Sequence, residues 1–456
     1  MITYAFPPAA GSGVMRTLKF AKYLPGNGWR PIILALKNPY PEKCDPAMLD
    51  ELSSDVKVFR TGMIDCLSFL LKIKKKIQGT RQQARGRAHT VHAAGGGGGN
   101  AGIFKSIERL VSTLFSTPDK YIGWLIPAVV RGMSIIRRED IDLIYSTSPA
   151  KTALLIGLCL KKISGKAWVV DFRDPWTLTL NGTGKRTVRL RFERWLESKV
   201  MKNADMIVAN TDYLRDAYVR EYQDIIVKKI KVITNGYDEA DFQDVRRARP
   251  LSDGRCIIGH IGEFYENIRR PDNFLKAVGE LVAEKKISPH TISIDFIGGG
   301  EYVLTDWYKQ LLAYVKLEGI VKSTGHIPHV QSLRSMLNAD ILLLLQPHPR
   351  SRLQIPAKAF EYMRCGGYIL TLAPEGATAA LMRKYAKGTV VREQEIGAIK
   401  NAVYFLYTQV MNKKIKGYET APDVSMYSRK QLTGDLAEVF DTCLLAYSKK
   451  FKEDKR

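Results

Sequence analysis

The sequence has few cysteines and no long hydrophobic run. Its six cysteines are scattered over 456 residues without a C-x-x-C pair, so neither a disulfide framework nor a zinc site is indicated, and we expect a reduced, cytoplasmic protein. No apolar run approaches the ~18 to 20 residues of a spanning helix, and the first residues lack the pattern of a signal peptide. These absences argue against a disulfide-stapled, zinc-binding, membrane-spanning or exported protein.

Acidic residues are scarce relative to basic ones. The chain has 46 Asp and Glu against 70 Lys and Arg, a formal net charge of +24, and residues 72–87 hold seven basic side chains and no acid. Such an excess favours an anionic partner: nucleic acid, a phosphorylated substrate or an acidic membrane face. Nucleic acid is not expected, because aromatic residues do not interleave with the basic runs. A solvated basic face is the structural alternative.

Short β-branched runs alternate with helical periodicity along most of the chain. This pattern predicts parallel sheets covered by helices on both faces, hence doubly wound α/β domains. We expect one domain over residues 1–235, a second over 236–425, and a crossing helix with a charged tail over 426–456. Residues 81–102 are rich in glycine and basic residues and predict a disordered loop.

The stretch from 104 to 138 combines apolar residues with Lys and Arg. Two interpretations remain open for it. It fits a surface helix that touches anionic lipid, with the part from Tyr121 to Ile136 at the lipid, and it equally fits ordinary amphipathic packing over a sheet.

A first candidate for phosphate binding joins a strand to a helix near the start of the chain. Gly11, Ser12 and Gly13 would leave backbone N–H groups at a helix start facing an anion. The segment is neither the G-x-G-x-x-G of nicotinamide-cofactor enzymes nor a P-loop. Because G-x-G turns are common, this signal is weak alone.

A second candidate follows the strand-like run "CIIGHI". Here Gly262 ends the run, and Arg269 and Arg270 stand just before a predicted helix. Paired guanidinium groups at the carboxyl edge of a parallel sheet can clamp a diphosphate. A solvent-exposed basic helix start is the alternative, although it opposes the helix dipole.

A third candidate is the segment "LQIPAKAFEYMRCGG". Pro356 suits the first position of a helix, which would leave the N–H groups of Ala357 and Lys358 for a phosphate, while Lys358 adds a charge. Glu361 lies one turn further on the same face and could accept hydrogen bonds from ribose hydroxyls. A plain Lys–Glu pair on a helix surface is the more common use of this spacing.

Four segments in this order, "FPPAAGSGVMRTLKFAKYLPGNGW", "WVVDFRDPW", "HIGEFYENIRRPDNFLKA" and "IPAKAFEYMRCGGYILTLAP", resemble those of glycosyltransferase family 4 enzymes with the GT-B fold. The resemblance implies two Rossmann-like domains facing across a cleft, with the acceptor in the first and a nucleotide sugar in the second. It implies that Glu361 binds the ribose and that Arg269 or Arg270 meets the diphosphate together with Lys358. The loop from Gly11 to Gly13 would border that diphosphate, and the backbone near Ile327 would read the base.

The sequence departs from the family pattern at two places. Such enzymes often carry two glutamates separated by seven residues, whereas the position eight before Glu361 is Leu353. Many also have a histidine after the fourth strand of the first domain, where this chain has "DFRDPW". Asp174, with Arg173 beside it, is therefore our catalytic candidate for orienting or deprotonating the acceptor. A structural Asp–Arg pair is the alternative for this segment. The resemblance implies neither a metal nor a cofactor.

The prediction for function is transfer of a hexose-type sugar from a nucleoside-diphosphate sugar, UDP or GDP, to a glycan or lipid-linked acceptor in cell-surface polysaccharide synthesis. Retention of configuration follows if the family's usual stereochemistry holds. The charge predicts peripheral attachment to the inner face of the cell membrane. Two alternatives stay open: a nucleotide-sugar epimerase of the same fold, and a non-catalytic sugar-nucleotide-binding module, which Leu353 favours.

Overall fold

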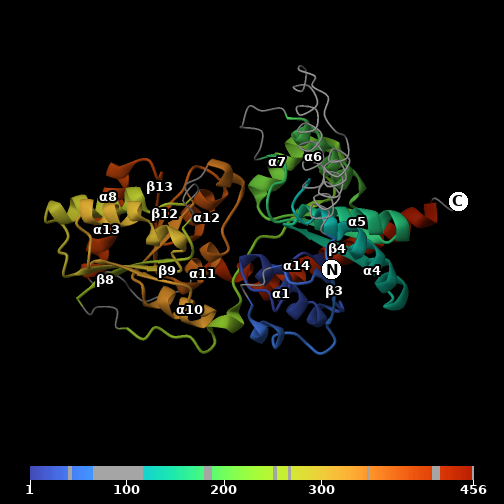
Figure 1. Cartoon of the computed structure of the whole chain (residues 1–456), viewed down its shortest axis with the longest axis horizontal. Coiled ribbons are helices and arrows are strands. Elements are labelled where there is room, and N and C mark those ends of the chain that lie inside the picture. The colour runs from blue at the N-terminus through green and yellow to red at the C-terminus, as the bar shows by residue number, and fades with distance from the viewer. Residues whose placement is uncertain are drawn as a thin grey trace, which may run out of the picture. The chain divides into compact units, whose positions relative to one another are not determined.

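The computed structural model describes residues 1–39, 44–64, 117–178, 187–249, 254–264, 269–346, 349–412 and 422–453. The loop expected over residues 81–102 lies outside this described part. The chain divides into two compact units, shown in Figure 1. The first comprises Met1–Val208, Tyr222–Lys231 and Ala437–Arg456, and the second comprises Ala209–Glu221 and Val232–Leu436.

The first unit is built on a seven-stranded sheet with the order β3-β2-β1-β4-β5-β6-β7. Its strands are β1 (Ile2–Thr3), β2 (Ile32–Leu36), β3 (Lys57–Thr61), β4 (Leu143–Ser148), β5 (Ala167–Phe172), β6 (Met206–Ala209) and β7 (Ile230–Val232). Its helices are α1 (Ser12–Tyr23), α4 (Leu125–Arg138), α5 (Lys151–Ser164) and α6 (Val188–Asn203). Helix α7 (Asp212–Tyr222) lies between β6 and β7 in the sequence, and nearly all of it belongs to the second unit. Strands β2, β4 and β5 are buried along their whole length, as expected for a sheet covered on both faces.

The second unit has a six-stranded sheet with the order β10-β9-β8-β11-β12-β13. Its strands are β8 (Cys256–Ile261), β9 (Ile292–Ile297), β10 (Val321–Thr324), β11 (Ile341–Leu345), β12 (Tyr368–Leu372) and β13 (Gly388–Val391). The helices are α8 (Asp272–Ala283), α9 (Asp306–Tyr314), α10 (His329–Asn338), α11 (Lys358–Cys365), α12 (Ala377–Tyr385) and α13 (Ile396–Met411). Strand β11 pairs in parallel with β8 and β12.

Two hydrophobic cores cover the two faces of the second sheet. Ile341, Leu343 and Leu345 of β11 belong to a core shared with α8 and α13, whereas Leu342 and Leu344 belong to another shared with α10 and α11. This alternation is the two-residue period of a strand. Figure 1 shows α8 and α13 on one side of these strands and α10 on the other. The sheet is therefore doubly wound, as the sequence predicts.

The last helix, α14 (Arg429–Glu453), is shared between the units. Its residues up to Leu436 belong to the second unit and those from Ala437 on belong to the first. In the first unit, the Phe440 ring packs edge-on against Tyr145 of β4 at 5.7 Å. The Trp29 indole donates a hydrogen bond to Asp441 at 3.1 Å. Helix α14 thus returns to the first sheet, as expected for the C-terminal segment.

Candidate active site

The glycine loop and the "DFRD" segment come together in the first unit. Helix α1 begins after Gly11, whose φ of 135° is a conformation that favours glycine. The Arg173 guanidinium, just beyond β5, donates to the Gly13 carbonyl at 2.6 Å. Asp174 is exposed next to it. The chain therefore ties the start of α1 to the end of β5 at the carboxyl edge of the sheet, where ligands of doubly wound folds bind.

The structural Asp–Arg pair of this segment does form, but with a different arginine. The Asp171 carboxylate takes two hydrogen bonds from Arg16 of α1, both 3.0 Å, and one each from Tyr145 at 2.7 Å and Thr147 at 2.8 Å. Burial opposes ionisation of Asp171, yet Arg16 and these donors hold its pKa below the usual value. Asp171 is thereby a structural residue, and Asp174 is the acid of this segment exposed to solvent.

In the second unit, Gly262 makes room for Lys358. Helix α11 begins at Lys358, two residues after Pro356, so Pro356 does not occupy the first helical position. The Lys358 ammonium donates to the Ile261 carbonyl at the end of β8. A Cβ atom on Gly262 would lie 1.8 Å from the Lys358 Nζ atom. Only glycine at this position lets the lysine reach the end of β8.

Arg269 adds a second positive charge to this place. Its guanidinium donates to the Gln346 side chain at the end of β11 at 2.8 Å. Burial and then the nearby Arg269 lower the pKa of Lys358 to about 7. Two cations crowded at a sheet edge raise each other's energy unless an anion joins them.

Glu361 shares this face of α11 but does not pair with the lysine. Among the described residues its carboxylate forms no hydrogen bond or ion pair, and Lys358 bonds to Ile261 in its place. The Lys–Glu helix pair therefore does not form as a direct contact, although the charge of Glu361 acts on Lys358 and opposes the lowering of its pKa. The backbone N–H groups of Ala357 and Lys358 also donate no hydrogen bond within the described chain, as expected at a helix start.

The two consecutive arginines separate. Arg270 pairs with Asp272, and its guanidinium lies 5.5 Å from the centre of the Tyr302 ring and 5.4 Å from that of Trp307. The structure thus places Arg269 with Lys358 and Arg270 in a separate aromatic cluster. A diphosphate contact by Arg270 stays a prediction.

The segment expected to read a base lies beside a glycine loop. Ile327 is half-buried between β10 and α10. The Gly298 N–H, just after β9, donates to the carbonyls of Thr324 at 3.0 Å and Gly325 at 3.2 Å. A Cβ on Gly298 would contact Gly262 at 3.7 Å, so this loop borders the end of β8.

Sequence reasoning missed Gln346 and the loop from Gly298 to Gly300. The signal was present, because "IGGG" and "LLQP" follow strand-like runs just as the selected motifs do. Their polar and glycine residues stand at the carboxyl ends of β9 and β11. A search of every strand end, rather than of motifs alone, would have found them.

His260 of β8 is buried close to Lys358 and Arg269. It is fully buried, its Nδ1 lies 2.8 Å from the Leu343 carbonyl, and its ring stacks on Phe264 with centroids 4.7 Å apart. Burial, and then the neighbouring Lys358, hold its pKa well below the usual value. A neutral histidine that donates to a backbone carbonyl supports a structural role rather than acid–base work.

Comparisons with known proteins agree with this architecture. Residues 79–241 match the family model described as Glycosyltransferase Family 4, and residues 255–409 match Glycosyl transferases group 1. No curated protein matches the sequence. The two family matches together cover more than two thirds of the chain.

Solved structures of the same fold cover nearly the whole chain. HepE from Anabaena, solved in complex with UDP, is 14% identical, with 97% of this chain and 99% of that one covered and a TM-score of 0.59. A Rickettsia africae glycosyltransferase is also 14% identical, with 97% and 98% covered and a TM-score of 0.61.

The lipopolysaccharide outer core galactosyltransferase WaaB is 13% identical, with 98% of this chain and 99% of that one covered and a TM-score of 0.53. At such identities the likeness shows the fold. The two family matches and the two doubly wound sheets lead to one conclusion: the chain belongs to the GT-B glycosyltransferases of family 4 and group 1.

Proposed function

We propose that this glycosyltransferase moves a hexose-type sugar from a UDP- or GDP-sugar to a glycan or lipid-linked acceptor in cell-surface polysaccharide synthesis, with retention of configuration. One observation carries the proposal: Lys358 at the start of α11 forms no ion pair among the described residues, and Arg269 lies close enough to lower its pKa. The UDP in the HepE structure supports a uridine donor.

The donor's diphosphate would bind at the tip of α11. The free N–H groups of Ala357 and Lys358 and the positive end of the helix dipole favour an anion there. Lys358 and Arg269 would neutralise the charge that grows on the diphosphate as the glycosidic bond breaks, which stabilises the transition state. The Glu361 carboxylate, one turn along, would accept hydrogen bonds from the ribose hydroxyls.

The glycine backbones around this place would leave room for the nucleotide. Gly262 and Gly298 lie side by side, and the backbone near Ile327 is bound to Gly298 through Thr324 and Gly325. We assign base contacts to this backbone. The half-buried Leu353 occupies the position at which a sugar-binding glutamate often stands in the family, so other groups must hold the sugar.

In the first unit, Asp174 would orient or deprotonate the acceptor hydroxyl. Its exposure allows contact with a substrate, and Arg173 fixes the adjoining backbone on Gly13. Replacement by Asn keeps the shape but removes the base. We expect Asp174→Asn to lower kcat by roughly 10²- to 10⁴-fold at unchanged affinity for the donor. A fall in donor affinity as large as the fall in kcat would contradict the role of Asp174 at the acceptor.

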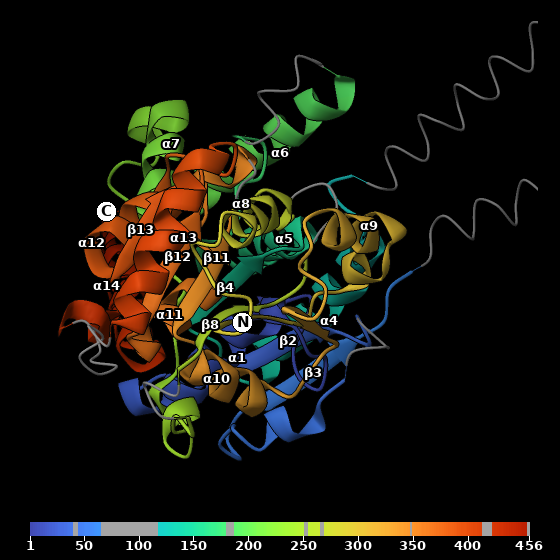
Figure 2. The same ribbon diagram turned by 90° about the vertical axis from the view of Figure 1, so that its left-hand side faces the viewer.

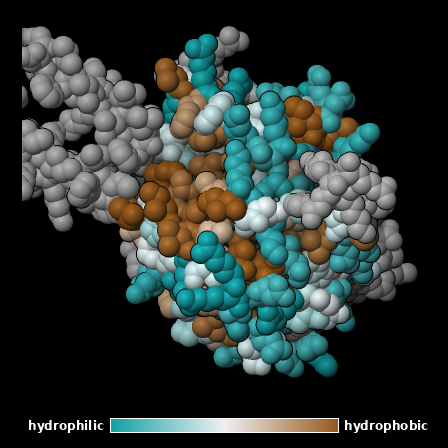
Figure 3. All heavy atoms as spheres, turned by 90° about the vertical axis from the view of Figure 1, so that its right-hand side faces the viewer, coloured by the Kyte–Doolittle hydropathy of each residue, from teal (hydrophilic) through white to brown (hydrophobic). Residues whose placement is uncertain are grey.

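We also propose that the enzyme works at the inner face of the cell membrane. No helix in the described part of the chain is long and apolar enough to span a bilayer. Helix α4 packs inward through the buried residues Ala128, Gly132 and Ile135, whereas Ile126 and Val130 are 65% and 67% exposed. Figure 3 shows hydrophobic residues gathered on the side of the molecule where α4 and α5 lie in Figure 1. Exposed apolar groups and a net charge of +24 both favour an anionic lipid surface.

A panel of nucleotide sugars and lipid-extracted acceptors tests the proposal. Release of nucleoside diphosphate that depends on both donor and acceptor is the expected result, and analysis of the product's anomeric configuration checks retention. Isomerised donor without transfer would mean an epimerase. Donor binding without any turnover would mean a binding module. Either result would overturn the proposed reaction.

A further inference from the structure

Helix α6 carries an exposed apolar stripe that the donor and acceptor sites do not use. Val188, Phe192 and Trp195 follow one another at helical spacing and are 77%, 37% and 54% exposed. The Phe192 and Trp195 rings stack with centroids 5.7 Å apart and planes 16° from parallel. Spacing of three and four residues puts all three side chains on one face.

Positive charge borders this stripe. Arg191, Lys199 and Lys202 are exposed on the same helix, and the Lys199 ammonium lies 5.6 Å from the centre of the Trp195 ring. Lysines and arginines beside Trp and Phe are typical of helices that lie in the interface of an anionic membrane.

The acids of α6 point the other way. Glu193 is buried and accepts from the Trp176 indole at 3.1 Å and from Arg189 at 2.8 Å. Glu197 is also buried and accepts from the Thr177 N–H at 3.3 Å and from the Tyr222 hydroxyl at 3.1 Å. No carboxylate of α6 therefore faces outward to repel an anionic surface.

The helix also stands at the right place in the fold. It starts after the segment that follows β5, which carries Arg173 and Asp174, so its first residues lie toward the carboxyl edge of the first sheet. Figures 1 and 2 both place α6 on the outside of the first unit. A lipid surface held by Val188 and Phe192 would lie near the side chain to which we assign the acceptor.

From the apolar stripe, its cationic border and the buried acids, we propose that α6 docks the enzyme on an anionic lipid bilayer through Val188, Phe192 and Trp195. Arg191 and Lys199 contact the headgroups. The inference rests on the proposed membrane location and gives it a second surface, separate from α4. It does not depend on which sugar is transferred.

Co-sedimentation of the full chain with vesicles tests the docking. Vesicles of phosphatidylcholine with about a third phosphatidylglycerol should bind the wild type far better than phosphatidylcholine alone, and added salt should weaken binding. The double variant Phe192→Ser/Trp195→Ser and the charge reversal Arg191→Glu/Lys199→Glu should each lower the partition coefficient by about tenfold or more. Tyr314→Ser, at an 80% exposed aromatic residue of α9, is the matched control and should bind as the wild type does.

A milder variant guards against misfolding of the double variant. Brominated lipid should quench tryptophan fluorescence of the wild type, and Trp195→Phe should remove most of that quenching while keeping the vesicle affinity. Quenching that survives Trp195→Phe, or a wild type that ignores anionic vesicles, would overturn the inference. So would loss of binding only in Ile126→Ser/Val130→Ser, or a dimer that Phe192→Ser/Trp195→Ser converts to monomer.

Sugar transfer, measured separately from vesicle binding, distinguishes the docking from the proposed reaction. A chain that binds vesicles through α6 but transfers no sugar would leave the docking intact and refute the proposed function. A chain that transfers sugar to a soluble acceptor but ignores vesicles would refute the docking and the proposed membrane location, but not the proposed reaction.

Discussion

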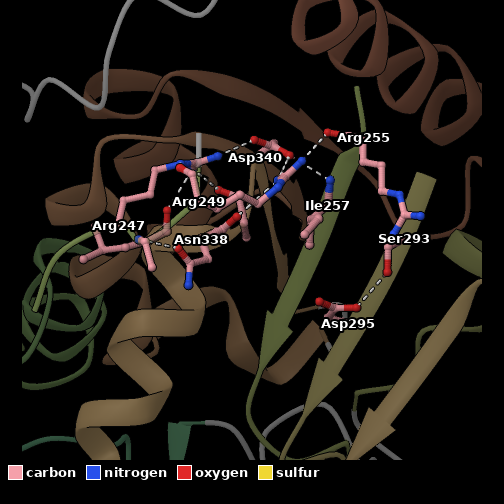
Figure 4. A network of polar contacts seen from close by, with 11 residues as sticks. Arg247, Arg249, Arg255, Ile257, Ser293, Asp295, Asn338 and Asp340 are labelled. Atoms are coloured by element: carbon pink, nitrogen blue, oxygen red, sulfur yellow. Dashed lines mark hydrogen bonds and ion pairs between the residues drawn. The ribbon is translucent and has the colours of Figure 1, made fainter. Parts of the chain in front are cut away.

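The two edges of the second sheet carry positive charge in opposite ways. At the amino edge, Asp340 lies just before β11. Its carboxylate forms ion pairs with the guanidinium groups of Arg247 at 2.8 Å and Arg249 at 2.6 Å, as Figure 4 shows. The same carboxylate accepts from the Ile257 N–H at 2.8 Å. At the carboxyl edge, Lys358 bonds to a neutral carbonyl, and Arg269 lies close enough to lower its pKa.

The difference separates a structural role from a binding role. Asp340 is buried and binds both arginines, and backbone carbonyls take further N–H groups of the two guanidinium groups. The Asp340 cluster is therefore built to hold the chain together. The Lys358 cluster has a charge that the described chain does not neutralise by an ion pair, at the edge where doubly wound folds bind ligands. Variants at the two edges should therefore change different quantities.

The largest effect on stability should come from the Asp340 cluster. Asp340→Ala leaves two arginines without their buried counter-charge, and we expect the free energy of unfolding to fall by about 3 to 5 kcal/mol. Chemical denaturation measures this loss. Asp295→Ala, which breaks one hydrogen bond from Ser293 in the same unit, is the control and should cost about 1 kcal/mol. Equal losses would mean that the Asp340 cluster contributes nothing special to stability.

Lys358→Met should weaken ligand binding without lowering stability, the opposite of Asp340→Ala. The variant removes a cation from a crowded place, so the free energy of unfolding should stay the same or rise. Loss of a charged hydrogen bond to the diphosphate should cost about 1.5 to 3 kcal/mol, or roughly 10- to 100-fold in Kd. Calorimetry with UDP and GDP measures the affinity. Lower stability at unchanged affinity would place Lys358 with the structural residues.

Glu361→Ala should give a smaller loss, confined to the ribose. We expect Kd for the nucleoside diphosphate to rise by about tenfold. The same loss should appear when the wild type binds a 2′,3′-dideoxy nucleotide, and the variant should no longer distinguish the two nucleotides. Additive losses in this cycle would show that Glu361 does not contact the ribose.

Sequence patterning predicts the architecture because burial repeats with the period of each element. Runs such as "ILLLL" of β11 are buried on both faces and therefore apolar throughout. Gly262, Lys358 and Glu361 were predictable as candidates because each stands at a strand end or a helix start. These positions are determined by neighbours in the chain.

Partners that lie far apart in the sequence were not predictable. Asp171 pairs with Arg16, 155 residues away, rather than with Arg173, two residues further along the chain. Arg269 and Arg270 are consecutive, yet Gln346 holds one and Asp272 the other. Asp272 is only two residues from Arg270, but the local pattern does not specify Arg16 or Gln346 as partners, because the packing of distant elements decides those contacts. The α6 stripe is different, since its spacing of Val188, Phe192 and Trp195 was readable and was overlooked.

Proton uptake when a nucleoside diphosphate binds tests the proposed role of the Lys358 cluster most directly. With a pKa of about 7 in the free protein, Lys358 is mostly neutral at pH 8, and a diphosphate that favours the charged form must raise this pKa. Affinity should therefore fall by roughly tenfold between pH 7 and pH 8.5. Calorimetry with UDP at pH 8, in two buffers of different ionisation enthalpy, should show close to one proton taken up per diphosphate, and Lys358→Met should abolish the uptake. Binding without proton uptake, with equal affinity in the variant, would contradict the assignment of the diphosphate to Lys358.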